Sequence, residues 1–100
     1  MQEMKMPELQ LGEKVEEIIF DNSEIRTARI TMRAYVDQGG EFTCREEGEW
    51  ISVIRGEVSL KVGEKDVHLR GAQKAFVPSM TPVKIVDSTD PCVLLSVLHK

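Results

Sequence analysis

The stretch GEWISVIRGEVSLKVG, residues 48–63, decides the fold of this chain. In its second half, Val58, Leu60 and Val62 alternate with polar residues. Alternation with a period of two is typical of a strand that buries one face, because successive side chains of a strand point to opposite sides. Gly56 separates this run from the preceding run WISVIR. The stretch therefore predicts two consecutive antiparallel strands joined by a tight turn.

Turn-forming residues recur outward from this pair of strands. Their spacing from Gly39 onward is about eight residues, which is typical of short strands in a β-sandwich or β-barrel. They are Gly39-Gly40, Gly48, Gly56, Gly63, Gly71, Pro78-Ser79 and Asp87-Ser88. The whole chain is therefore expected to be all-β.

Three further segments fit this architecture. Between Arg26 and Val36 apolar and polar residues alternate, which predicts a strand and not a helix. Residues 92–98 are apolar on both faces except at Ser96, as expected of a strand that is covered on both sides. Residues 15–20 fit either a short helix or a strand, and we favour a strand. We assign residues 1–14 to an N-terminal tail or edge segment and residues 15–100 to one β-barrel domain.

Composition excludes several classes of function. A chain of 100 residues holds one domain, and its net charge of −4 disfavours nucleic acid and anionic membranes as partners. No apolar run is long enough to span a bilayer, and the N-terminus has no apolar segment typical of a signal peptide. Two cysteines are too few for a disulfide framework or a structural zinc site. We therefore expect a cytoplasmic protein with free thiols.

The segment from Gly40 to Pro82 resembles the cupin family, whose members are small antiparallel β-barrels of the jelly-roll type. Glu49 is followed by WISVIR and then Gly56, which is similar to the first cupin motif. Gly71 precedes FVPSMTP, in which Pro78 takes the proline position of the second motif. The resemblance implies a single-domain antiparallel cupin (jelly-roll) β-barrel.

The chain departs from these motifs at the positions that bind metal in the family. Counting along the motifs places Phe42, Cys44 and Val83 where the family has histidines, and only Glu49 keeps a typical ligand. A catalytic metal normally takes about three protein ligands. We therefore expect no metal and no cofactor. If a metal were bound, Cys44 and Glu49 would be its ligands.

Glu49 is the best candidate for a catalytic residue, although no catalytic role is assigned. Its parity with Ile51 and Val53 points it into the barrel, where it could anchor a ligand or act as a general base. Alternatively, it is hydrated or paired with an arginine such as Arg29, Arg33 or Arg45. The resemblance places the following residues around a ligand pocket: Phe42, Cys44, Glu49, Ile51, Val53 and Val83.

Three functions remain open at this point. The first is binding of a small molecule, of the sugar or organic acid class, without clear catalysis. The second is a regulatory or structural module that acts as a dimer. The third is an isomerase, epimerase or lyase of sugars or keto acids that uses Glu49. Because cupins are commonly dimers, the resemblance implies a homodimer, with Trp50 and the N-terminal segment as interface candidates.

Overall fold

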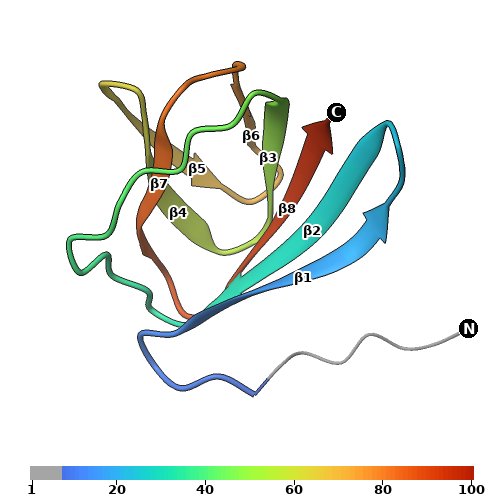
Figure 1. Ribbon diagram of the computed structural model, residues 1–100. Coiled ribbons are helices and arrows are strands. Elements are labelled where there is room, and N and C mark those ends of the chain that lie inside the picture. Colours follow the sequence, from blue (N-terminus) through green and yellow to red (C-terminus); the bar gives the residue numbers. More distant parts are fainter. Residues whose placement is uncertain (1–7) are drawn as a thin grey trace, which may run out of the picture.

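The computed structural model describes residues 8–100, which form eight strands and no helix (Figure 1). The strands are β1 (Lys14–Asp21), β2 (Ile25–Met32), β3 (Gly48–Arg55), β4 (Glu57–Val62), β5 (Lys65–Arg70), β6 (Lys74–Val77), β7 (Val83–Ser88) and β8 (Cys92–His99). The strand expected at residues 15–20 is confirmed as β1. Residues 1–7 of the predicted tail lie outside the described residues.

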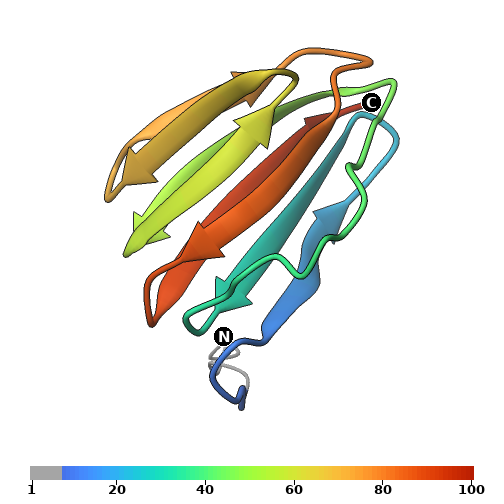
Figure 2. The same cartoon turned by 90° about the vertical axis from the view of Figure 1, so that its left-hand side faces the viewer.

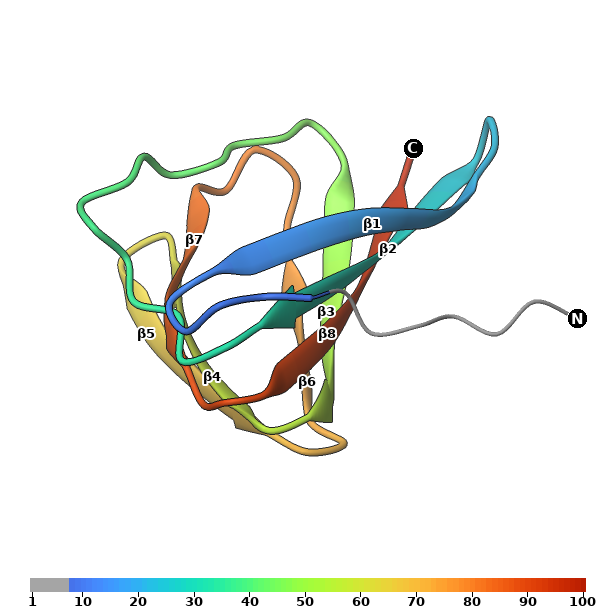
Figure 3. The ribbon, with the colours of Figure 1, turned by 90° about the horizontal axis from the view of Figure 1, so that it is seen from below.

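The strands form two sheets that face each other (Figure 3). The larger sheet has the order β1-β2-β8-β3-β6 and the smaller sheet the order β5-β4-β7, and every pairing is antiparallel. The predicted all-β class is therefore confirmed. No helix that could cross a membrane occurs among residues 8–100.

A long connection joins β2 to β3 across the side of the molecule where β7 approaches β1 and β2 (Figure 2). Isolated bridges pair Val36 with Asp87 and Thr43 with Val83, so the connection runs beside β7. The alternation of the sequence continues to Val36, but β2 ends at Met32. Ala34 has a φ of 48°, outside the β region, and this ends the strand.

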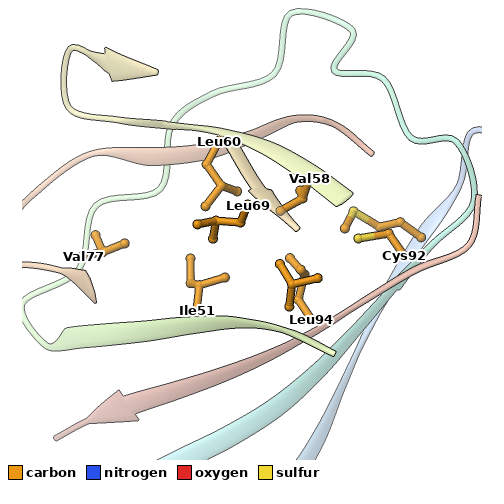
Figure 4. Close-up of a cluster of buried hydrophobic side chains, with 9 residues drawn as sticks. Ile51, Val58, Leu60, Leu69, Val77, Cys92 and Leu94 are labelled. Carbon is orange, nitrogen blue, oxygen red and sulfur yellow. The ribbon is translucent and has the colours of Figure 1, made fainter. Parts of the chain in front are cut away.

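The core lies between the sheets (Figure 4). Its centre is made by apolar side chains that alternate along their strands, and Leu94 of β8 and Val58 of β4 are fully buried. β8 lies between β2 and β3, and its outer face carries Val93, which is buried, and Leu95 and Val97, which are half-buried. The inner face of β3 contributes Ile51 and Val53 to this core.

The outer face of the larger sheet carries a row of aromatic side chains. The strand register aligns Phe20, Thr27, Val97, Trp50 and Phe76 in one row across all five strands. Trp50 and Phe76 contact each other with ring centroids 5.0 Å apart, and both are exposed, as is Phe20. We call the three exposed rings of this row the aromatic row.

The outer face of the smaller sheet is polar. Ser59 lies opposite His68 on one side and Asp87 on the other. The two ring nitrogens of His68 contact the Ser59 hydroxyl at 3.1 Å and the Glu57 carboxylate at 3.2 Å. His68 therefore lies outside the sandwich. The two sheets present opposite chemistry to their surroundings.

Candidate functional site

A cavity of about 210 Å³ opens between the larger sheet and the connection. β1, β3, β7 and the connection all contribute to its wall. Charged residues of both signs share the lining with aliphatic ones, so the cavity is more polar than the sequence suggested. The lining residues are Lys14, Glu16, Ile30, Tyr35, Asp37, Gly40, Glu41, Thr43, Arg45, Glu49, Ile51, Val83, Lys84 and Ile85.

Glu49 lies on the inner face of β3 and is only 9% exposed. The hydroxyl of Ser96, from the adjacent strand β8, donates a hydrogen bond to Glu49 Oε2. No other hydrogen bond to the carboxylate is made within residues 8–100, so Oε1 has no protein donor there. A buried carboxylate with one neutral donor retains the capacity to accept further hydrogen bonds.

The arginines considered as partners for Glu49 are engaged elsewhere or unpaired. Arg29 pairs with Glu17 at 2.8 Å, and Arg33 pairs with Asp90 at 2.9 Å. The guanidinium of Arg45 makes no ion pair or hydrogen bond with the described part of the chain, although it lines the cavity. The cavity therefore contains a free cation and a partly satisfied carboxylate.

One ion pair fixes the connection at the entrance to the cavity. Lys84 Nζ lies 2.9 Å from Asp37 Oδ2, and the amide of Gly40 donates to Asp37 Oδ1 at 2.9 Å. The hydrogen bond from Lys84 is the main cause that lowers the pKa of Asp37 below its ordinary value of 3.8. Lys84 also lies 4.8 Å from the centroid of the Phe42 ring.

Backbone contacts fix the other end of the connection. Thr43 and Val83 exchange two backbone hydrogen bonds of 2.9 Å, and the amide of Met80 donates to the carbonyl of Arg45 at 2.7 Å. The Ser79 hydroxyl donates to the carbonyl of Glu46. These contacts hold the connection so that Thr43 and Arg45 line the cavity.

The structure brings together three of the six predicted pocket residues. Glu49, Ile51 and Val83 line the cavity, whereas Val53 is buried in the core next to it. Phe42 and Cys44 are exposed and do not line the cavity. Both cysteines of the chain are free, and burial raises the pKa of Cys92 to about 11.

Sequence reasoning missed Tyr35, Thr43, Arg45 and Lys84 as lining residues. Phe42 and Cys44 are placed in the pocket by counting along the cupin motif, whereas period-two parity with Glu49 would select Thr43 and Arg45. Residues 44–47 form no strand, so motif spacing does not carry over to this segment. The charged character of Arg45, in a segment without an evident partner, was the available signal.

The fold agrees with solved structures, although no family model and no curated protein matches the sequence. An RmlC-like cupin from Shewanella frigidimarina NCIMB 400 superposes with a TM-score of 0.70 at 18% identity, over 88% of this chain and 77% of that one. A cupin superfamily protein from Desulfitobacterium hafniense DCB-2 gives a TM-score of 0.76 at 8% identity, over 93% and 83%.

This chain has the cupin fold. A protein of Ralstonia eutropha JMP134 with the provisional name mannose-6-phosphate isomerase also shares this fold. It gives a TM-score of 0.80 at 15% identity, over 92% of this chain and 91% of that one. At these identities the likeness concerns the fold alone, so the site must be judged on its own residues.

The residues present do not fit the metal that the cupin motifs hold. Among residues 8–100, no group of three or more His, Cys, Asp or Glu side chains is arranged to hold a metal ion. Cys44 lies outside the cavity, and the neighbour that contacts the Glu49 carboxylate is a serine hydroxyl. The described groups around Glu49 are therefore hydrogen-bonding groups and not a set of metal ligands.

Proposed function

We propose that this cupin-fold chain binds a small polar molecule, of the sugar or organic acid class, in the 210 Å³ cavity and without a metal. The observation that carries the proposal is the unpartnered Oε1 of Glu49. Oε1 is not one of the fully buried side-chain atoms that lack a partner among residues 8–100, so solvent reaches it from the cavity. Hydroxyl groups of a ligand would replace this hydration by donating to Oε1.

Arg45, which lines the same cavity, supports the same proposal. Its guanidinium carries five N–H donors and has no partner among the described residues. A carboxylate or several hydroxyl oxygens would accept from it. Sugars and hydroxy acids present donors and acceptors at short spacing, which matches one acceptor and one donor group facing the same cavity.

We favour binding without catalysis because the one hydrogen bond of the Glu49 carboxylate within residues 8–100 comes from a serine hydroxyl and not from a second titratable group. A proton abstracted by a general base must be balanced by charge stabilisation elsewhere on the substrate. Arg45 and Lys14 line the same cavity and could supply this stabilisation, so isomerase, epimerase or lyase chemistry at Glu49 is the alternative that a turnover assay must address.

The test is a thermal-shift panel of neutral sugars, sugar acids and hydroxy acids on the parent chain and on Glu49→Gln. We expect at least one compound to raise the melting temperature of the parent, since a ligand that binds only the native state stabilises it. Glu49→Gln should reduce the shift, whereas Glu64→Gln, on an exposed turn, should leave it unchanged. A panel with no shift contradicts the proposal, and consumption of the binding compound, followed by NMR, favours the enzyme.

A second function, as a homodimeric module, is favoured by the aromatic row. Exposed fractions of 50% for Phe20, 37% for Trp50 and 45% for Phe76 on one sheet face are unusual beside the polar outer face of the other sheet. Aromatic residues are enriched in protein interfaces. Phe76→Lys should shift the mass in sedimentation from dimer to monomer, and Ser59→Lys should not. A parent that is monomeric at tens of micromolar excludes this function.

A further inference from the structure

A second hollow of about 240 Å³ adjoins the cavity on the inner face of the larger sheet. Glu16 and Arg45 line both hollows, so the two share a wall. Ile18 of β1 and Leu98 of β8 line only the second one. Leu98 pairs with Glu49 in the sheet register, which places the second hollow directly beside the candidate site.

The two hollows follow β1 in sequence order. Lys14 lines the first, Glu16 lines both, and Ile18 lines the second. These residues lie two apart on the inner face of the strand, and each residue of a strand advances the chain by roughly 3.4 Å. The four steps from Lys14 to Ile18 therefore span about 14 Å along the two hollows. This length suits an elongated molecule better than a single small ring.

Volume supports joint occupancy. Each hollow, at about 210 and 240 Å³, is smaller than the roughly 300–1,000 Å³ of a typical pocket for a drug-sized molecule, whereas the two together fall within that range. Arg45 at the shared wall can donate to groups on both sides, because its five N–H donors spread over a planar fork.

The charges of the second hollow favour a neutral molecule. Arg26 and Lys100 both pair with Asp21, at 3.2 and 2.5 Å, so neither is a free cation. Glu16 and Glu47 add two carboxylates opposite the guanidinium of Arg45. The second hollow therefore contains both hydrogen-bond acceptors, on Glu16 and Glu47, and donors, on Arg45. Such a mixture binds hydroxyl groups, and the aliphatic side chains of Ile18 and Leu98 suit the C–H faces of a sugar ring.

We propose that the two hollows act as adjoining subsites for a neutral disaccharide, with one ring over Glu49 and the other over Ile18. This inference rests on the proposed function and narrows its ligand class. The link between the rings passes Glu16 and Arg45, which both subsites share. A single ring would fill only one subsite and use only part of these contacts.

The experiment compares monosaccharides with their own disaccharides by titration of amide chemical shifts in NMR. The probes are glucose with maltose and cellobiose, galactose with lactose, and mannose with mannobiose. At least one disaccharide should bind about tenfold more tightly than its monosaccharide, and its shifts should include residues of β1 and β8 at the second subsite. Equal affinities across every pair would overturn the inference.

Variants on β1 separate the two subsites. Ile18 is 53% exposed, so Ile18→Trp should fill the second hollow without unfolding the chain. It should remove the advantage of the disaccharide and leave the affinity for the monosaccharide unchanged. Ile19→Trp, at the neighbouring exposed position outside both hollows, is the matched control. An unaltered disaccharide affinity in Ile18→Trp contradicts the second subsite.

The remaining outcomes distinguish this inference from the proposed function. If only charged sugar acids or hydroxy acids bind, the cavity function stands and the neutral disaccharide is excluded. If monosaccharides bind and no disaccharide binds better, the cavity function again stands alone. If no sugar and no organic acid binds, the proposed function fails and this inference fails with it.

Discussion

Replacement of Ser96 by alanine tests whether its hydroxyl holds the Glu49 carboxylate. Ser96 is 2% exposed. Its hydroxyl makes the one hydrogen bond that the Glu49 carboxylate accepts within residues 8–100. A hydrogen bond to a charged group contributes about 1.5–3 kcal/mol, and removing one partner leaves the other buried without it. We therefore expect Ser96→Ala to lower the free energy of unfolding by about 2 kcal/mol. For a domain of this size that corresponds to a fall of roughly 8–16 °C in melting temperature.

The assay is urea unfolding followed by the fluorescence of Trp50, with calorimetry for the melting temperature. Ser52→Ala is the control, because Ser52 lies on the outer face of β3 and should change stability by less than about 0.5 kcal/mol. In a double-mutant cycle with Glu49→Gln, the two changes should couple by about 1 kcal/mol. A Ser96→Ala chain that melts within 2 °C of the parent, by the conversion used above, would refute the reasoning.

Three other perturbations test the surroundings of the site. Asp37→Asn removes the acceptor of the Lys84 ion pair. The folded state lowers the pKa of Asp37 below 3.8, so the stabilisation by this carboxylate is complete above pH 3.8 and is lost as pH falls through the folded pKa. The melting temperatures of parent and variant should therefore converge below pH 3.8. A thiol reagent at pH 8 should modify exposed Cys44 in the native chain. It should spare Cys92, whose pKa is raised to about 11, until urea unfolds the protein. Rapid reaction of both thiols, measured by mass spectrometry, would contradict the burial of Cys92. Gly56→Ala should destabilise by about 2 kcal/mol or more, since Gly56 has a φ of 86° and an added Cβ would lie 2.5 Å from a backbone oxygen, whereas Gly71→Ala, with nothing within 4 Å, should be tolerated in the same urea assay.

The strands could be predicted because their signal is local. Val58, Leu60 and Val62 alternate within one segment, and the same face is buried along it in the structure, most completely at Val58 and Leu60. In residues 92–98 the inner side chains are buried in the core, and on the outer face Val93 is buried while Leu95 and Val97 are half-buried. In both segments the burial of side chains follows the geometry of a single strand, so it leaves a regular pattern in the sequence.

The cavity could be predicted only where it rests on a strand. Glu49 and Ile51 lie on the inner face of β3 as expected, but the connection delivers Thr43 and Arg45 where the motif spacing places Phe42 and Cys44. The conformation of the connection depends on contacts with β7 that are distant in sequence, including the hydrogen bonds between Thr43 and Val83. No local periodicity encodes such contacts.

The connection between β2 and β3 carries residues of the candidate binding cavity, whereas the strands carry the core that stabilises the fold. Thr43 and Arg45 belong to a segment attached mainly at its ends, whereas the apolar core is built from strands that the segment does not replace. Loop closure costs little for a few added residues, about 0.6 kcal/mol for each doubling of length. Residues 38–42 are therefore a natural place to graft a different sequence, and new specificities could be selected there on an otherwise unchanged scaffold.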